Sequence, residues 1–333
     1  MIQTRRILSL FIPFTLCVVV AFFGTAMAKD EPVHDDIFSI AFPTEKDGWA
    51  AGRWGTILHT SDGGNSWARQ ESGIDTTLVA VHFADARNGW AVGVKGTIVH
   101  TSDGGTTWKK QDCPVDYLLM DVAFVSPKKG WVVTEQTHIL ATQDGGKTWQ
   151  VQFAAADFIL RAVSFSDPLH GWTVGEYGYI YRTEDGGESW QEQAGYFDVD
   201  EDGELVGDPS LYDVVAIDAA KAWAVGLDGH VIFTEDGGKE WKTVDVGAPS
   251  VPLYCIEAGN PRTLVLAGKG ICLASGDGGK SWKNPSFEPP IQYTWIYALT
   301  RRGSSDFVAG GEGGIIYLGS QNKPWSRVNY RLK

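Results

Sequence analysis

The sequence predicts an all-β fold, a seven-bladed β-propeller of four-stranded antiparallel blades, and three observations support this prediction. A seven-residue motif, Ser-Asp-Gly-Gly-Asn-Ser-Trp at 61–67, recurs in near-copies almost to the end of the chain. Its closing tryptophans lie at positions 67, 108, 149, 190, 241, 282 and 325, so four of the six spacings are 41 residues. Upstream of the motif, five repeats carry a strand of the Gly-Trp-Ala-Val-Gly type, and an alternating apolar strand precedes it.

Each repeat therefore divides into four strands in a fixed order. The first strand alternates apolar residues, the second is the Gly-Trp strand, the third is of the type of 56–60, and the fourth starts at the motif tryptophan. We expect the first strands at residues 37–42, 78–83, 119–124, 160–165, 211–217, 253–258 and 295–300. The last strand completes blade seven, so no strand exchange between the termini is required. Whether residues 29–36 add an edge strand to blade seven stays open.

The motif is explained as the hairpin between the third and fourth strands. Asp-Gly between two strands is a strong hairpin signal, because glycine adopts positive φ freely and aspartate accepts hydrogen bonds from the N–H groups of the turn. We expect the motif tryptophan to be a wedge buried between neighbouring blades. The repeated Asp and Trp residues are thus interpreted as structural rather than catalytic.

These repeats resemble the Asp-box, or BNR repeat, of sialidases, sortilin-type receptors and some endoglucanases. Seven copies coupled to the Gly-Trp-Ala-Val-Gly strand, in a single propeller behind an export signal, are more similar to the photosystem II stability/assembly factor family. The match runs over nearly the whole chain after the export signal. The resemblance implies a propeller that binds a protein partner, because relatives assist photosystem assembly.

Residues 1–28 are predicted to be a signal peptide. Arg5 and Arg6 form a positive start, residues 7–23 are apolar, and Ala26-Met27-Ala28 is a cleavage site of the A-x-A type. We expect cleavage after Ala28 and a periplasmic or secreted protein. An uncleaved membrane anchor is the alternative, because the apolar stretch is long for a signal.

Charge and cysteine content narrow the possible partners. Without the signal, 26 Lys and Arg residues face 41 Asp and Glu residues, a net charge near −15. This acidity argues against a nucleic-acid partner, because phosphate binding needs a positive surface. We expect residues 29–333 to form one domain, since a propeller adds blades to a single ring. Cys255 and Cys272 are expected on strands too far apart for a disulfide, as small buried hydrophobic residues.

The period is interrupted once, by an acidic insert at about 196–209 between blades four and five. Its carboxylates follow the D-x-D-x-D-G spacing of calcium loops, although Pro209 stands where such loops place a bidentate glutamate. Candidate calcium ligands are Asp198, Asp200, Asp202, Glu204 and Asp208. A solvated acidic loop without metal is the equal alternative. No other cofactor is expected.

The candidate partner site lies on the face where the second-to-third strand turns and the blade-to-blade connections meet. Exposed aromatic side chains beside charged ones favour a protein interface. The candidate residues are Arg53, Trp54, Lys95, Arg161, Glu176, Tyr177, Asp228, Lys269, Glu312, Tyr293 and Trp295, with further aromatic residues at strand starts such as Tyr212 and Tyr254. The alternative is that the aromatic residues at strand starts point inward as blade core.

Two function classes follow. The favoured one is a non-enzymatic extracytoplasmic binding platform, an assembly or accessory factor for a membrane-protein complex. The alternative is a glycoside hydrolase, which needs two carboxylates about 5–10 Å apart across a sugar site. Glu135, Glu176, Asp228 and Glu312 are its candidates, but Arg53 and Arg161 alone do not make the arginine cluster of a sialidase. A pair of convergent acids in the central cleft would favour hydrolysis, and a broad aromatic patch would favour a partner.

Overall fold

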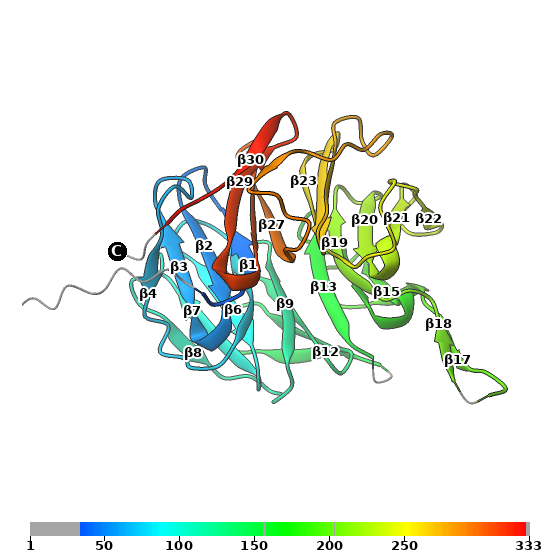
Figure 1. Ribbon diagram of the computed structural model, residues 1–333. Helices are drawn as coiled ribbons and strands as arrows, with labels where there is room; N and C mark the ends of the chain where they lie inside the picture. Colours follow the sequence, from blue (N-terminus) through cyan, green and yellow to red (C-terminus); the bar gives the residue numbers. More distant parts are fainter. Residues whose placement is uncertain (1–33, 156–157, 203, 331–333) are drawn as a thin grey trace, which may run out of the picture.

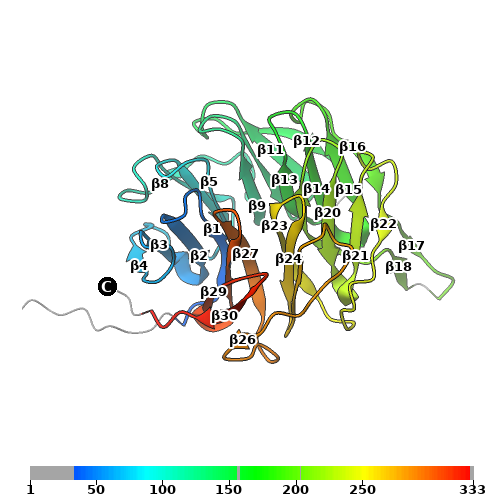
Figure 2. The same ribbon diagram turned by 90° about the horizontal axis from the view of Figure 1, so that it is seen from above.

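The computed structural model describes residues 34–155, 158–202 and 204–330, so the predicted signal peptide lies outside the described residues. Seven sheets follow one another around a ring (Figures 1 and 2). The inner strand of each blade contacts the inner strand of the next, and β27 of the last blade contacts β1 of the first. The seven-bladed propeller predicted from the repeat is therefore confirmed.

Five blades have the expected four antiparallel strands in sequence order. Blade one contains β1 (Ile37–Ala41), β2 (Gly48–Gly52), β3 (Ile57–Thr60) and β4 (Ala68–Gln70), and blade two contains β5 (Leu78–Phe83), β6 (Gly89–Gly93), β7 (Thr97–Thr101) and β8 (Lys109–Gln111). Blade three contains β9 (Leu119–Phe124), β10 (Gly130–Thr134), β11 (His138–Thr142) and β12 (Gln150–Ala154), and blade four contains β13 (Leu160–Phe165), β14 (Gly171–Gly175), β15 (Ile180–Thr183) and β16 (Gln191–Ala194). Blade five contains β19 (Leu211–Ala216), β20 (Ala222–Gly226), β21 (Val231–Thr234) and β22 (Lys242–Thr243).

The last two blades depart from the four-strand pattern. Blade six has β23 (Leu253–Asn260), β24 (Thr263–Gly268) and β25 (Cys272–Ser275), and its fourth strand is reduced to one bridge between Ala274 and Lys283. Blade seven has β27 (Ile296–Arg302), β28 (Asp306–Gly311), β29 (Ile316–Ser320) and β30 (Lys323–Arg327). A fifth strand, β26 (Phe287–Glu288), pairs with β30 in parallel. Three prolines at 285, 289 and 290 offer no N–H, which explains why the chain leaves blade six early.

The tryptophans of the Gly-Trp strands fill the space between blades. Trp90 of β6 is fully buried and stacks on Phe124 of the next blade with ring centroids 3.5 Å apart. The motif tryptophan Trp149 meets the same Phe124 edge-on at 5.9 Å. Motif tryptophans Trp67, Trp149, Trp190 and Trp325 are buried, whereas Trp108, Trp241 and Trp282 are half-buried. The motif tryptophan thus shares the wedge position that was predicted for it with the tryptophan of the second strand.

Glycine precedes the second-strand tryptophan because an aromatic ring lies against it. A Cβ at Gly89 would come within 2.3 Å of the Phe83 ring, so no side chain fits there. The motif hairpin also forms as predicted: Gly63 and Gly64 have φ of 75° and 88°, and Asp62 Oδ1 accepts the Ser66 N–H.

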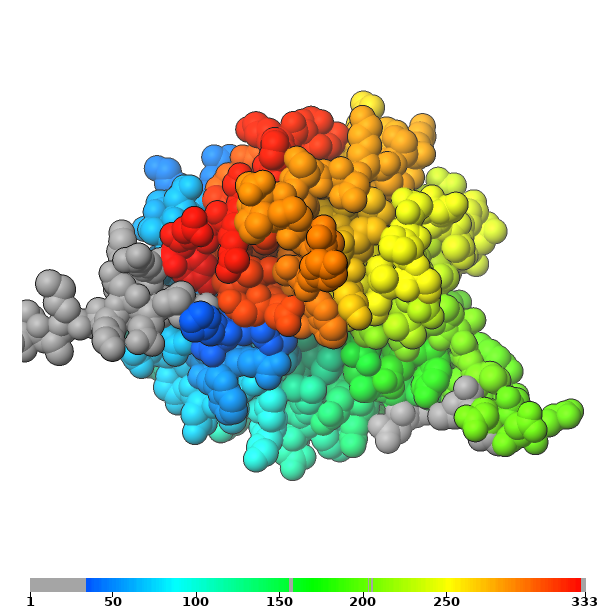
Figure 3. Space-filling view, in the orientation of Figure 1, coloured from blue at the N-terminus to red at the C-terminus, as the bar shows by residue number. Residues whose placement is uncertain are grey.

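Two further sequence predictions concern the insert and the cysteines. The insert forms a hairpin, β17 (Phe197–Val199) and β18 (Leu205–Gly207), that projects from the body of the ring in Figures 1 and 3. We call this hairpin the arm. Cys255 and Cys272 are free and buried, as expected. No helix within the described part of the chain is long and apolar enough to cross a membrane.

Candidate functional site

A β-bulge at the same place in every inner strand builds the mouth of the central channel. In blade five, Leu211 pairs with Gly226 and Asp213 pairs with Val225, which leaves Tyr212 between them unpaired. All seven inner strands skip their second residue in this way. These bulge residues, which all line one cavity of about 500 Å³, are Phe38, Val79, Met120, Arg161, Tyr212, Tyr254 and Tyr297. We call this ring of seven side chains the channel mouth.

Four neighbouring blades place aromatic rings at the channel mouth. Ring centroids are 5.5 Å apart between Tyr212 and Tyr254, 5.6 Å between Tyr254 and Tyr297, and 5.5 Å between Tyr297 and Phe38. We call these four rings the aromatic arc. Trp295 extends it outward, 5.9 Å from Tyr254 and 6.1 Å from Tyr297. All four arc residues are half-buried, so one side of the mouth offers a continuous, accessible aromatic surface.

Cationic side chains border this aromatic surface, and two of them also have an acidic partner. The Arg53 guanidinium lies 5.6 Å from the Phe38 ring and is 2.6 Å from Asp36. The Arg161 guanidinium lies 4.9 Å from the Tyr212 ring and 3.4 Å from Glu176. The Lys269 ammonium lies 5.3 Å from the Trp295 ring. Rings of this surface therefore already act as acceptors for cations.

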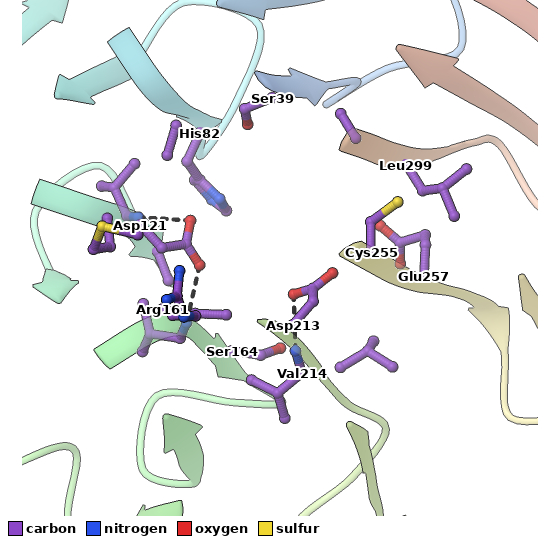
Figure 4. Close-up of a pocket in the computed structure, with 18 of the residues that line it drawn as sticks. Ser39, His82, Asp121, Arg161, Ser164, Asp213, Val214, Cys255, Glu257 and Leu299 are labelled. Carbon is purple, nitrogen blue, oxygen red and sulfur yellow. Dashed lines mark hydrogen bonds between the residues drawn. The ribbon is translucent and has the colours of Figure 1, made fainter. Parts of the chain in front are cut away.

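Three carboxyl groups line the channel below the mouth, as Figure 4 shows for Asp121, Asp213 and Glu257. Burial raises the pKa of Asp121 to about 7 and the pKa of Glu257 to about 6. Burial also raises the pKa of Asp213 well above its ordinary value, and the Asp121 charge adds to that rise. On the blade next to that of Asp121, burial lowers the pKa of His82 to about 4, which keeps the imidazole neutral near pH 7.

The two aspartates also connect neighbouring blades. Asp213 Oδ2 accepts the Ile256 N–H of blade six at 2.8 Å, while Oδ1 accepts the Val214 N–H. In blade one, Ser39 holds the position equivalent to Asp213, and its hydroxyl accepts the Val81 N–H of blade two at 3.1 Å. We call this bond from an inner strand to the next blade the inter-blade bond. It satisfies a main-chain donor at the open edge of an inner strand.

The structure brings only part of the predicted partner site to the aromatic arc. Four of the predicted residues contact arc rings or their Trp295 extension: Arg53, Arg161, Lys269 and Trp295. The other predicted residues lie on the surrounding turns, namely Trp54, Lys95, Glu176, Tyr177, Asp228, Tyr293 and Glu312. Of these, Trp54 and Tyr293 are 68% and 88% exposed.

Two of the turn residues have roles within the fold. Glu176 binds Arg161 and accepts the Ile159 N–H at 3.2 Å. Tyr177 packs against Phe197 of the arm at 5.3 Å. Neither contact was predictable from the sequence, because both join segments that are separate in the chain. Both side chains are consequently engaged in holding blade four and the arm in place.

The four carboxylates proposed for glycoside hydrolysis lie on separate turns of separate blades. Glu135, like Glu176, accepts a main-chain N–H, that of Leu118 at 2.8 Å. The acids that do converge in the channel, Asp121, Asp213 and Glu257, were missed. A signal was available, because each is a charged residue within the alternating apolar strand that begins its repeat. The central cleft therefore contains both the aromatic surface and the convergent acids that were expected to discriminate between the two function classes.

The candidate calcium ligands lie on the arm. Asp200 Oδ1 accepts the N–H groups of Asp202 and Glu204, and Tyr196 donates its hydroxyl to Asp198. Among the described residues, no group of three His, Cys, Asp or Glu side chains is placed to hold a metal ion. Calcium binding by Asp198, Asp200, Asp202, Glu204 and Asp208 stays a prediction, and the absence of heat on titration with millimolar calcium would end it.

Comparison with known proteins places these features in a family context. A family model described as Photosynthesis system II assembly factor YCF48 matches residues 67–116, 108–158 and 150–317, which together run without a gap from residue 67 to residue 317. Among curated proteins, no sequence match was found.

Solved structures with the same fold include two of YCF48. One, described as YCF48 bound to D1 peptide, has a TM-score of 0.71 at 21% identity, covering 87% of this chain and 93% of the other. YCF48 from Cyanidioschyzon merolae has a TM-score of 0.71 at 20% identity, covering 87% and 97%. The GH74 xyloglucanase from Xanthomonas campestris has a TM-score of 0.70 at 12% identity and is covered over 55% of its length, against 90% of this chain. At these identities the structural likeness shows the fold alone.

Proposed function

Since the chain belongs to the photosynthesis system II assembly factor YCF48 family, we propose that it is a non-enzymatic binding platform that holds an exposed segment of a membrane-protein complex at the channel mouth. The observation that carries this proposal is the aromatic arc. Accessible aromatic rings on a rigid scaffold supply large contact area at low entropic cost, and they are enriched where proteins bind one another. A YCF48 structure with a bound D1 peptide supports a segment as ligand.

The proposed location is outside the cytoplasm, in the periplasm or secreted. The support is the sequence at 1–28, with its basic start, apolar stretch and cleavage site after Ala28. Intact-mass measurement of the protein purified from its source tests this part. A mature chain starting at Lys29 is expected, and a chain that still carries Met1 would contradict cleavage.

Capture of partners from native membranes tests the binding role. We expect wild-type protein to recover a membrane-protein complex and the double variant Tyr254→Ala/Tyr297→Ala to lose at least about nine tenths of it, since loss of central aromatic anchors typically costs over 1 kcal/mol each. A matched control is Val151→Ala/Leu169→Ala, which removes two exposed apolar side chains away from the mouth. Equal recovery of the complex by all three proteins would show that the partner does not bind at the channel mouth.

Glycoside hydrolysis is the second candidate, and the specific observation in its favour is the set of channel acids with raised pKa values. Against it, Asp121 and Asp213 each use both carboxyl oxygens to accept main-chain N–H groups. A release assay on xyloglucan and sialylated glycans discriminates the two classes. Turnover by wild-type protein that disappears in Asp121→Asn/Asp213→Asn would favour the enzyme.

A further inference from the structure

We propose that the channel mouth is a cation-recognition pocket, in which the aromatic arc and the carboxylate of Asp213 receive one lysine or arginine side chain of the bound segment. This inference deepens the proposed binding function and rests on it. It names the chemistry of the residue that the partner must present.

Among the described residues, the carboxyl groups of Asp121 and Asp213 in the upper channel have no cationic partner. The hydrogen-bond partners of Asp121 and Asp213 are main-chain N–H groups, and within the described ranges neither lies at ion-pair distance from a Lys or Arg. The guanidinium at the mouth, that of Arg161, is engaged with Glu176 and with the Tyr212 ring. Asp121 and Asp213 are thus enclosed without a counter-ion. A negative charge on one of these carboxyl groups makes ionisation of the other less favourable.

The inter-blade bond does not require a charge. Ser39 makes it in blade one with a neutral hydroxyl, whereas Asp121 and Asp213 make it in blades three and five with carboxylates. A serine would fill this role without the cost of enclosing a carboxylate. The two aspartates therefore need an explanation beyond connecting the blades, and a cationic ligand supplies one.

The aromatic arc leaves its two central rings available. The protein's own cations lie over Phe38, Tyr212 and Trp295, at the ends and on the outer side of the aromatic surface. Over Tyr254 and Tyr297, no Lys or Arg of the described chain is placed. Aromatic rings around a cavity attract ammonium and guanidinium groups, and a carboxylate below the rings adds to that attraction.

The distances along the strand suit a long side chain. The arc residues are second in their strands and Asp213 is third, so its Cα lies about 3.3 Å further along the channel. Lysine carries its charge at the end of a flexible four-carbon stem. A segment lying across the mouth can therefore keep its main chain outside, place the stem between the tyrosines and bring the charge to Asp213. The cavity of about 500 Å³ has room for such a side chain.

Titration of two short peptides into the full chain tests the proposal. The probes are capped Gly-Gly-Lys-Gly-Gly and the same peptide with norleucine, which keeps the apolar stem and lacks the charge. We expect the lysine peptide to bind at least about tenfold more tightly by NMR or calorimetry, the size of a desolvated cation contact. Equal affinities, or no binding of the lysine peptide up to about 10 mM, would overturn the proposal.

A matched pair of variants separates the pocket from general attraction to an acidic protein. Asp213→Ser removes the charge and retains a hydroxyl for the inter-blade bond, as in Ser39, and it should abolish the preference for lysine. Asp218→Ser removes an exposed aspartate on the opposite face and should leave the preference unchanged. If Asp213→Ser does not fold, Tyr254→Ala/Tyr297→Ala serves instead and should likewise abolish it. A preference that survives these variants would contradict the pocket.

A third probe, n-butylammonium, distinguishes a peptide side chain from a free amine. Binding as tight as that of the lysine peptide would mean a small amine ligand and would overturn the part of the proposal that names a protein segment. The outcomes also separate this inference from the proposed function. If partner capture depends on the aromatic arc but the lysine peptide is not preferred, the binding platform is supported and the cation pocket is contradicted. If the lysine peptide is preferred but no partner is captured, the cation pocket is supported and the binding platform is contradicted.

Discussion

Asp121 Oδ2 in blade three accepts a hydrogen bond of 2.9 Å from the Val163 N–H in blade four. The same bond recurs from blade one to blade two through Ser39, and from blade five to blade six through Asp213. Side chains of blades one, three and five thus satisfy main-chain donors at the inner edge of the ring, where the inner strands have no further strand to pair with. Substitution by a neutral residue with a hydroxyl separates the role of Asp121 and Asp213 in the inter-blade bond from the role of their charge.

Replacing Asp121 by leucine should destabilise the ring, and replacing it by serine should cost less. Leucine leaves the N–H groups of Val163 and Val122 without their acceptor, and each unsatisfied buried donor costs about 1–3 kcal/mol. Serine retains one acceptor, as Ser39 does. Urea unfolding at pH 5, where the Asp121 carboxyl is largely protonated, measures the difference. A leucine variant as stable as wild type would show that the inter-blade bond contributes nothing.

The stability that Asp121 contributes to the fold should fall as pH rises from about 4 to 7. The pKa of Asp121 is raised to about 7 in the folded protein by burial, above the ordinary value of 3.8. As pH rises through this window the unfolded chain loses the proton while the folded chain keeps it, so folding becomes less favourable until the folded group also ionises. Glu257, whose pKa is raised to about 6, and Asp213 act in the same direction.

Melting temperatures at pH 4.5 and pH 8, for wild type and Asp121→Ser, check this sign. We expect the gap in melting temperature between wild type and variant to favour wild type more at pH 4.5 than at pH 8. His82 acts in the opposite direction. Its pKa is lowered from 6.5 to about 4 in the folded protein, so within this window the unfolded chain binds a proton that the folded chain does not. The variant retains His82, and the comparison with wild type therefore isolates the contribution of Asp121. An unchanged gap would mean that Asp121 titrates near its ordinary value.

Substituting the tryptophans of the two repeat motifs should give unequal losses. Trp90→Ala removes a fully buried indole stacked between blades and should cost about 3–5 kcal/mol of unfolding free energy. Trp108→Ala, on a half-buried motif tryptophan, should cost less. Chemical denaturation with both variants compares them directly. Equal losses would mean that both tryptophans contribute equally, and a larger loss in Trp108→Ala would make the motif tryptophan the main wedge.

The repeat predicted the ring because its regular spacing reflects contacts that are made within each single blade. The Asp-Gly-Gly turn and the glycine that accommodates Phe83 act within one blade, so each copy carries its own evidence. The channel mouth was not predictable in the same way. A bulge leaves Tyr212 and Tyr297 unpaired only through the register with the neighbouring strand, and that register is invisible in a pattern of alternating residues. The turn residue Trp54 was correctly expected at the surface, yet exposure alone did not bring it to the aromatic arc.

Removal of the arm should have little effect on the stability of the ring, because the described residues of the arm contact the ring only near its base. Phe197 packs against Phe158 at 5.0 Å and against Tyr177 at 5.3 Å, and the Tyr196 N–H donates to the Tyr177 carbonyl. Beyond this base the arm is a two-stranded hairpin, which adds little stability by itself. Replacing residues 197–207 with two glycines should therefore change the melting temperature by no more than about 2 °C, the shift that roughly 1 kcal/mol produces in a chain of this size.

The matched control for the arm is Phe158→Ala, which keeps the arm and removes the buried ring beneath it. This variant should lower the melting temperature considerably more, because a buried phenylalanine contributes about 3–5 kcal/mol. Differential scanning calorimetry of both proteins compares the two changes on one scale. If loss of the arm lowered the melting temperature as much as Phe158→Ala, the insert would be a structural part of blade four. In that case Val199 and Val206, which are exposed on the arm, would need partners within the ring that the contacts at its base do not provide.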